Sequence, residues 1–303
     1  MSYIALTVRY EADLAILTFN RPEKRNAVSP EMIVELLTAL DEIEHSQVRV
    51  GILTGAGKTF CSGMDLDALK DLAAQARNTA VSTEAEVQAP ATAGLMDVAV
   101  RVLKGQVEER APLSPMTEPT ELALESSRTM ARMFRRIYDF PKPLIAAVNG
   151  AAIAGGCGIA TLCDFTLAVP EAKFGYTEVR IGFVPAIVSV FLIRQIGEKR
   201  ARDLLLTGRI IDAEEAYRLG LASEIVTPER LMDRTRELAG QLLENSPTSL
   251  SFTKQVLTNL SQHDIDRGLE LAIEANAGIR STPDFREGVS AFLEKRKPVW
   301  HSK

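Results

Sequence analysis

Two glycine-rich loops, each directly after a run of buried β-strand character, are the parts of this sequence best suited to chemistry. The first is Gly55-Ala-Gly-Lys-Thr-Phe-Cys-Ser-Gly-Met-Asp65, and the second runs from Asn149-Gly150 to Gly155-Gly156. Glycines just ahead of a helix let a ligand approach the backbone and leave N–H groups of the first helical turn free to bind negative charge. One N–H from each loop could converge on a single oxygen, which indicates an oxyanion pocket lined by main chain. A purely structural glycine turn is the alternative interpretation.

A single carboxylate stands where it could move protons. Glu178 lies in the loop Lys173-Phe-Gly-Tyr-Thr-Glu178-Val-Arg-Ile-Gly-Phe-Val-Pro185, among apolar neighbours. A glutamate in such a loop is usually a solvated charge. If its neighbours partly desolvate it, its pKa rises and it becomes suited to general acid–base catalysis. The sequence leaves both interpretations open.

Other catalytic chemistries find little support. Gly57-Lys58-Thr59 has the form of the end of a phosphate-binding P-loop, but the glycine required five residues earlier is Ile52. The cysteines and histidines are not spaced as zinc ligands or as a Ser-His-Asp triad, so we expect reduced cytosolic thiols, no metal and no histidine chemistry. These residues are Cys61, Cys157, Cys163, His45, His263 and His301.

The sequence predicts that strands and helices of an α/β core position these groups and that the C-terminal end is helical. Residues 3–9 and 13–20 alternate as strands, and Ser29-Pro30-Glu31 opens a helix with Ser29 as its N-cap. Further strands are predicted at 48–54, 144–148, 165–169 and 222–226. Further helices are predicted at about 120–138, 187–196, 199–206, 212–220, 229–244, 264–279 and 283–295, with another opening at Ser246-Pro247.

We therefore predict an α/β core over 1–207 and a mainly helical region over 208–303. Residues of about 77–119 interrupt the core with a stretch rich in Ala, Thr, Glu and Pro, near helical fragments at Leu66–Ala76 and Gly94–Lys104. We interpret 77–119 as an insertion, either a lid over a substrate or an inert surface excursion.

The composition is that of a soluble globular protein, with 303 residues of which 46 % are hydrophobic and 25 % charged. A net charge of −5 gives no electrostatic basis for binding nucleic acid or a membrane surface. The uncharged stretch from Pro143 to Cys163 is long enough to span a bilayer, but its glycines and asparagine favour a buried core segment. The first residues alternate like a strand instead of forming a signal peptide, so we expect a cytoplasmic protein.

Several further segments, taken in order with these loops, resemble the enoyl-CoA hydratase/isomerase (crotonase) family over nearly the whole chain apart from about 70–119. Their order and spacing are specific, although no single piece is decisive. The segments are Asn20-Arg-Pro-Glu-Lys-Arg-Asn-Ala27, Leu53–Leu66, Lys142–Gly150, Gly155-Gly-Cys157, Cys163-Asp164, Phe174-Gly-Tyr-Thr-Glu178, Leu206-Thr-Gly208, Ala216, Gly220-Leu221, Glu287-Gly288 and Phe292-Leu-Glu-Lys-Arg-Lys297.

The resemblance implies a spiral of ββα turns with a helical C-terminal trimerisation region, assembled as a homotrimer or as a hexamer. It implies an acyl-CoA thioester substrate and no other cofactor. The N–H groups at Met64 and Gly155 would hold the thioester oxygen, and Glu178 would be the catalytic carboxylate. CoA would contact residues of two regions, the second from a neighbouring subunit. They are Arg25, Ala27, Asp65 and Leu66, together with Phe292 and Lys295.

One position departs from the family pattern. Hydratases of the family typically use two glutamates, but the first position here is Gly158, and Pro185-Ala-Ile-Val-Ser189 replaces a glycine-rich turn. This combination resembles the methylglutaconyl-CoA and geranoyl-type hydratase branch. A 2-enoyl-CoA hydratase with one glutamate is therefore the first hypothesis. A double-bond isomerase, which needs one carboxylate, is the second. A thioester hydrolase or decarboxylase and, as a class of its own, a CoA-ester binding protein without turnover are the remaining hypotheses.

Overall fold

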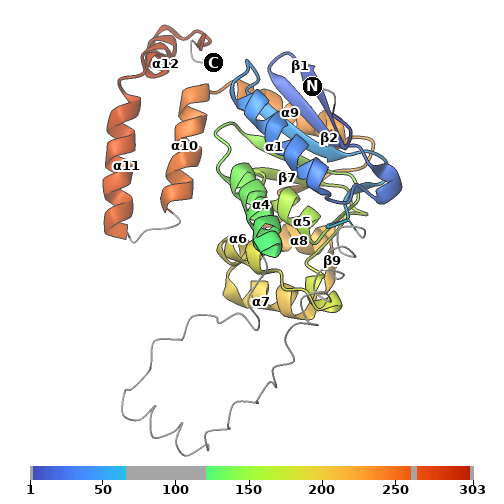
Figure 1. The fold of residues 1–303 in the computed structure, drawn as a ribbon. Coiled ribbons are helices and arrows are strands. Elements are labelled where there is room, and N and C mark those ends of the chain that lie inside the picture. Colours follow the sequence, from blue (N-terminus) through green and yellow to red (C-terminus); the bar gives the residue numbers. More distant parts are fainter. Residues whose placement is uncertain (1–2, 66–120, 261–264, 301–303) are drawn as a thin grey trace, which may run out of the picture. The chain divides into compact units, whose positions relative to one another are not determined.

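The computed structural model describes residues 3–65, 121–260 and 265–300, except the side chains of 265 and 266 (Figure 1). The contacts group the chain into two units, Met1–Asp65 with Thr129–Lys303 and Leu66–Arg128. Of the second unit only 121–128 is described, where Arg128 pairs with Glu121 at 2.7 Å. The expectations for 66–76, 77–119 and 94–104 lie outside the described residues, and the boundary at 207/208 stays a prediction.

A six-stranded sheet forms the larger part of the α/β core, in the order β1-β2-β3-β5-β7-β10. β1 runs antiparallel to β2, and the other neighbours are parallel. Its strands are β1 (Leu6–Glu11), β2 (Leu14–Phe19), β3 (Val50–Gly55), β5 (Leu144–Val148), β7 (Phe165–Ala168) and β10 (Glu224–Ile225). β5 lies inside the sheet between β3 and β7 and helices pack against it, so it is buried along its whole length, as its apolar sequence predicts.

A second sheet consists of four short strands, three of which each follow a strand of the first sheet along the chain. Its order is β4-β6-β8-β9, and its strands are β4 (Thr59–Cys61), β6 (Ala151–Ile153), β8 (Lys173–Gly175) and β9 (Ile210–Asp212). The sequence predicts loops at β4, β6 and β8, and the structure shows strands. Segments of three residues are too short for a strand period to be read from sequence, and these are ordered by pairing with each other.

Helices connect the strands and form the C-terminal end. They are α1 (Pro30–Glu44), α4 (Glu121–Tyr138), α5 (Gly155–Leu162), α6 (Ala186–Ile196), α7 (Glu198–Thr207), α8 (Ala213–Leu219), α9 (Leu231–Leu243), α10 (Pro247–Leu260), α11 (Ile265–Ile279) and α12 (Pro283–Glu294). Two 3₁₀ turns lie at Pro22–Lys24 and Glu178–Ile181. No described helix is both long and apolar enough to cross a membrane.

Local signals set the helix ends where the sequence predicts them. Ser29 accepts a hydrogen bond from the N–H of Met32 at 3.3 Å, and Pro30 occupies the first helical position of α1. At α8, Asp212 caps the start and Gly220 ends the helix with a left-handed backbone.

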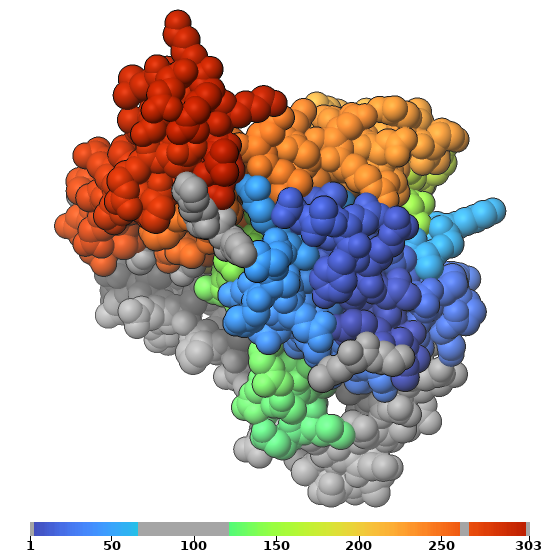
Figure 2. Space-filling model, turned by 90° about the horizontal axis from the view of Figure 1, so that it is seen from above, coloured from blue at the N-terminus to red at the C-terminus, as the bar shows by residue number. Residues whose placement is uncertain are grey.

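The C-terminal helices differ from the core in how much apolar surface they expose. α10 and α11 pack on each other, and both views show α11 and α12 at one side of the chain (Figures 1 and 2). Large apolar side chains on these three helices are exposed in the single chain, among them Leu257, Leu269, Ile273, Val289, Phe292 and Leu293.

Candidate active site

The two glycine-rich loops meet in the structure. A Cβ added to Gly63 would lie 2.8 Å from the Cβ of Ala154, 3.0 Å from the carbonyl oxygen of Ile153 and 3.7 Å from the nitrogen of Gly155. A Cβ added to Gly156 would lie 2.3 Å from the carbonyl oxygen of Cys61. Only glycine allows so close an approach of two backbones, so the two loops lie directly against each other.

Within the described part of the chain, no hydrogen-bond acceptor takes the peptide N–H of Met64 or of Gly155. Val28 bridges Met64 because its N–H donates to Gly63 and its carbonyl accepts from Asp65, at 2.7 and 2.9 Å. The N–H of Met64 is therefore directed away from Val28. The N–H of Gly155 belongs to the first turn of α5, where no intrahelical acceptor exists. Together they provide two donors on adjoining loops.

Ala154, just before the first turn of α5, has an unusual backbone. Its φ is 49° and its ψ is −123°, a backbone conformation that residues other than glycine rarely adopt. Its N–H donates to the carbonyl of Gly175 at 2.7 Å, which ties the start of α5 to the end of β8. This bond connects the loop before Gly155 to the segment that leads to Glu178.

Glu178 has the environment required for acid–base chemistry. The carboxylate is half-buried, and burial raises its pKa above the ordinary value. Its Oε2 atom is buried and has no hydrogen-bond partner among the described residues. The negative charge of Glu178 contributes to the raised pKa of the Cys157 thiol, in the first turn of α5. Of the two interpretations that the sequence leaves open, the structure favours the desolvated carboxylate.

Gly158 lies in a crowded part of the same helix. A Cβ there would stand 3.0 Å from Phe134 and 3.0 Å from Val188. Phe134 comes from α4, and its ring also lies 3.9 Å from the position of a Cβ on Gly155. A larger side chain at 158 would have to displace both neighbours, so this place is filled by an aromatic ring and not by a second carboxylate.

Comparison with known proteins agrees with this geometry. The sequence pattern of the enoyl-CoA hydratase/isomerase family matches residues 9–98 and 113–303. The chain belongs to this family. It is 41 % identical to a Thermus thermophilus protein over 94 % of this chain and 96 % of that one. It is 31 % identical to a crotonyl-CoA hydratase of Syntrophomonas wolfei over the full length of both. The crystal structure of an enoyl-CoA hydratase from Shewanella pealeana superposes with a TM-score of 0.80 at 26 % identity, over 98 % of this chain and 96 % of that one.

In this member of the enoyl-CoA hydratase/isomerase family, the loop before α1 carries two residues that hold the site loops together. The sequence did not predict this role for either of them. Arg21 donates to Asp65 at 2.7 Å and to the carbonyl of Ala27 at 3.0 Å. Asn26 is fully buried and its amide donates to the carbonyls of Ala56 and Thr59 at 2.9 and 2.7 Å. Both lie within the motif of residues 20–27, but Asp65, Ala56 and Thr59 are at least 30 residues away in sequence, so no local pattern predicts these bonds.

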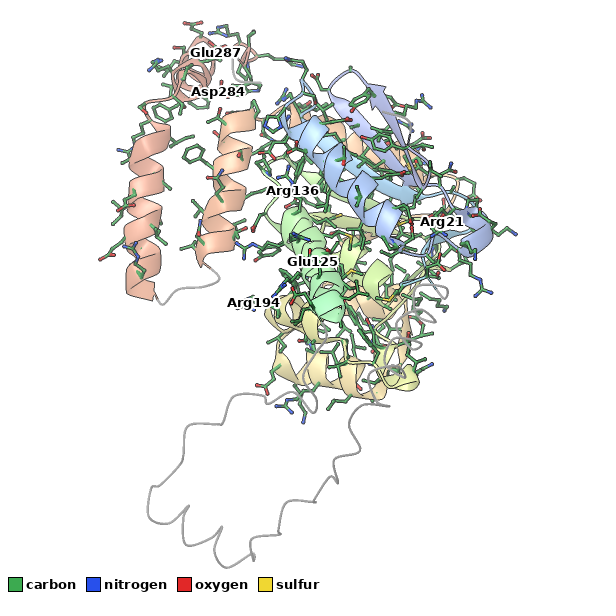
Figure 3. All side chains as sticks on the ribbon, viewed as in Figure 1. Arg21, Glu125, Arg136, Arg194, Asp284 and Glu287 are labelled. Carbon is green, nitrogen blue, oxygen red and sulfur yellow. The ribbon has the colours of Figure 1, made fainter. Side chains whose placement is uncertain are left out.

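The predicted CoA-binding residues of this family member fall into two groups. Arg25, Ala27 and Asp65 come together, because the N–H of Ser62 donates to Arg25 and Arg21 bridges Ala27 and Asp65. The carboxylate of Asp65 is buried against Arg21. Leu66 lies outside the described residues. Phe292, 83 % exposed, and Lys295 belong to the end of α12, whose Glu287 lies far from Arg21 in Figure 3.

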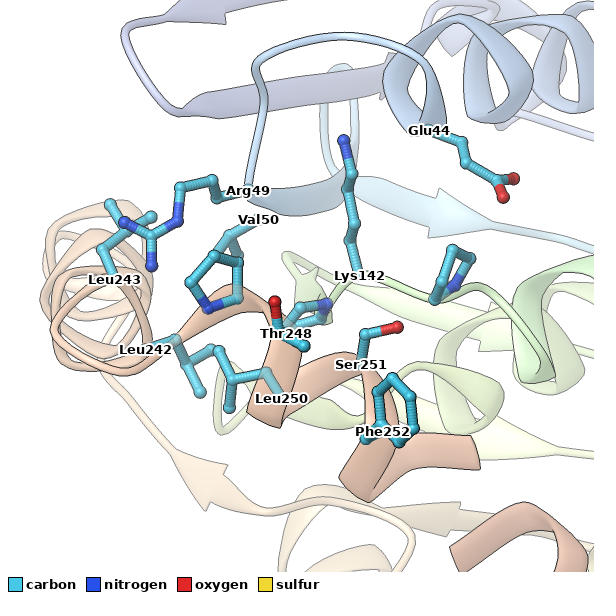
Figure 4. Close-up of a pocket in the computed structure, with 13 residues that line it drawn as sticks. Glu44, Arg49, Val50, Lys142, Leu242, Leu243, Thr248, Leu250, Ser251 and Phe252 are labelled. Atoms are coloured by element: carbon cyan, nitrogen blue, oxygen red, sulfur yellow. The ribbon is translucent and has the colours of Figure 1, made fainter. Parts of the chain in front are cut away.

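A cavity of about 320 Å³ lies at the end of the strands opposite to the two glycine-rich loops (Figure 4). It opens at the amino ends of β3 and β5, whereas Met64 and Gly155 follow the carboxyl ends of these strands. Its basic residues hold neighbouring segments: Lys142 donates to the carbonyls of Ile43 and Ser46, and Arg49 donates to that of Asn245. The cavity is therefore separate from the candidate active site.

The three cysteines are free and buried. Desolvation raises the pKa of Cys61 and of Cys157 to about 12, so both thiols are protonated near neutral pH. Burial also raises the pKa of Cys163. Within the described part of the chain, no group of His, Cys, Asp and Glu could hold a metal ion.

Proposed function

We propose that this protein is a 2-enoyl-CoA hydratase that works with Glu178 as its catalytic carboxylate. The observation that carries the proposal is the meeting of the Met64 and Gly155 loops, together with a half-buried carboxylate at Glu178 whose pKa is raised and whose charge acts on Cys157 of α5. The relative from Syntrophomonas wolfei, which matches over the full length of both chains, is a crotonyl-CoA hydratase. The substrate is an acyl-CoA thioester, and no further cofactor takes part.

In the proposed reaction Glu178 accepts a proton from water as the oxygen adds to the β-carbon of the enoyl group. The electrons move to the thioester oxygen, where the N–H groups of Met64 and Gly155 stabilise the enolate. Preorganised donors of this kind contribute about 3–4 kcal/mol each to transition-state stabilisation. Glu178 then returns its proton to the α-carbon. One carboxylate can perform both transfers because its raised pKa suits it to accept and to donate near neutral pH.

CoA binding is proposed to use Arg25, Ala27 and the Asp65-Leu66 turn of one subunit. Phe292 and Lys295 are proposed to come from a neighbouring subunit, since they project from α12 apart from this group. The exposed apolar residues of α10, α11 and α12 support assembly into a trimer or a hexamer. Light scattering coupled to size-exclusion chromatography distinguishes these states from a monomer.

A double-bond isomerase is the second candidate, and Gly158 is the observation that favours it. The space around this residue is filled by Phe134 and Val188, so position 158 itself supplies no second acid. A 3-enoyl to 2-enoyl shift requires one base to carry one proton between two carbons.

The deciding experiment follows purified protein in D₂O with crotonyl-CoA and, separately, with a 3-enoyl-CoA. Gain of one water together with loss of the conjugated absorbance establishes the hydratase. Deuterium uptake with a moved double bond and no gain of water establishes the isomerase. Binding of both thioesters without either change would leave a CoA-ester binding protein and contradict both activities.

A further inference from the structure

A buried tyrosine lies two residues before Glu178. Tyr176 is 1 % exposed, and its hydroxyl lies 3.2 Å from Oγ1 of Thr161 on α5. Either hydroxyl could be the donor in this bond, and Oγ1 of Thr161 also lies 2.9 Å from the carbonyl oxygen of Cys157. The thiol of Cys157 is also within hydrogen-bonding reach of the tyrosine hydroxyl. This small polar group therefore connects the Glu178 loop to α5.

The hydrogen bond between Tyr176 and Thr161 lies directly after the point where the pairing of β8 with β6 ends. β8 pairs with β6 as far as Gly175, and the N–H of Ala154 donates to Gly175 at 2.7 Å. Beyond Glu178 the chain is exposed to solvent, as Ile181 and Val184 show. Tyr176 is the buried side chain between these two regions, and a second bond from Gln195 of α6 to the carbonyl of Thr161, at 2.6 Å, holds its partner in place.

We propose that Tyr176 is a positioning residue, which holds the carboxylate of Glu178 at a set distance from the Gly155 N–H through its hydrogen bond to Thr161. The proposal rests on the proposed function, in which both groups act on one thioester. The same helix, α5, carries Thr161 and the Gly155 N–H, so the bond couples the base to the oxyanion donor. A misplacement of about 1 Å between catalytic groups can reduce turnover by roughly 100-fold.

Paired substitutions of the hydrogen bond test the proposal. Tyr176→Phe keeps the ring and removes one hydroxyl of the bond, and Thr161→Val removes the other. We expect each to lower kcat by about 10- to 100-fold with little change in KM, and the double variant to lose no more than either one. Thr161→Ser should restore kcat. Thr235→Val is the matched control, since Thr235 is a fully buried threonine of α9 whose hydroxyl bonds the carbonyl of Leu231, at 2.8 Å.

A readout independent of turnover separates this proposal from the proposed function. The pKa of the Glu178 carboxyl is measured by ¹³C NMR in the wild type and in Tyr176→Phe, with Glu178→Gln to assign the signal. Release of the carboxylate to solvent should lower its pKa in Tyr176→Phe. A lowered pKa in a protein that turns over no CoA ester supports the positioning role and contradicts the proposed function. An unchanged pKa in a folded variant, or an unchanged kcat in a protein that does turn over, overturns the positioning role.

Discussion

The guanidinium of Arg21 donates to the carboxylate of Asp65 at 2.7 Å, and the two side chains are 21 % and 6 % exposed. The pair joins the loop after β2 to the residue that follows Met64. It therefore helps to set the direction of the Met64 N–H, although it lies outside the set of residues expected to touch the reacting atoms.

Arg21→Met should destabilise the protein and impair its site together. Loss of the arginine leaves the carboxylate of Asp65 buried without this partner, which costs about 3–5 kcal/mol in comparable buried pairs. Urea unfolding measures the loss of stability, and kcat measures the displacement of the Met64 loop. Arg230→Met is the control, because its pair with Glu237 is on the surface and such pairs contribute about 0–1 kcal/mol. Equal stability of the two variants would contradict the structural role of the Arg21 pair.

Glu178→Gln should strongly reduce turnover and preserve binding. General acid–base groups contribute about 10²- to 10⁴-fold to rate, so we expect a loss of kcat in this range with the Kd for an acyl-CoA little changed. Stopped-flow or steady-state absorbance and calorimetric titration measure the two quantities. Glu171→Gln, at an exposed turn, should behave as the wild type. Retained turnover in Glu178→Gln would remove this residue from the mechanism.

The pH dependence of kcat/KM should report the raised pKa of Glu178. A general base must be ionised, so the acidic limb of the profile should lie above 4.5, the ordinary value for glutamate. The folded state holds this proton more tightly than the unfolded chain. Stability therefore decreases as pH rises from 4.5 through the folded pKa. Urea titrations of the wild type and Glu178→Gln over this interval should differ in slope, and identical slopes would show that the carboxyl has its ordinary pKa.

Alanine substitutions along α5 should destabilise in a set order. Gly156→Ala should be most costly, because the new Cβ would lie 2.3 Å from the backbone oxygen of Cys61, which cannot move freely. Gly158→Ala should cost less, since its contacts at 3.0 Å are side-chain atoms of Phe134 and Val188. Gly155→Ala, with its nearest contact at 3.9 Å, should be close to neutral. Overpacking typically costs about 1–3 kcal/mol, a range that thermal or urea unfolding resolves.

Lys295→Ala should raise the KM for acyl-CoA substrates about several-fold, since a surface charge on a phosphate contributes roughly 1 kcal/mol or less. A thioester of N-acetylcysteamine lacks the phosphates of CoA, and its KM should not change. Lys297→Ala is the control, because Lys297 is also an exposed lysine just beyond α12. An equal effect of Lys295→Ala on both thioesters would place Lys295 outside the CoA site.

The sequence by itself determined the features that depend on neighbours along the chain. Ser29 and Pro30 predict the start of α1, the apolar run Leu144–Val148 predicts a buried strand, and Asp212 with Gly220 predicts both ends of α8. These features follow from capping geometry, backbone freedom and hydrophobic pattern, which act over a few residues. The glycine loops and their suitability for an oxyanion were predicted in the same way.

Tertiary structure alone decided what depends on residues distant in sequence. The three-residue strands β6, β8 and β9 exist because they pair with each other. The meeting of Gly63 with Ala154 brings the Met64 and Gly155 loops together, and only packing reveals that Phe134 and Val188 fill the space at Gly158. The raised pKa of Glu178 likewise results from burial, a property of the folded environment that the residues beside it in the chain do not specify.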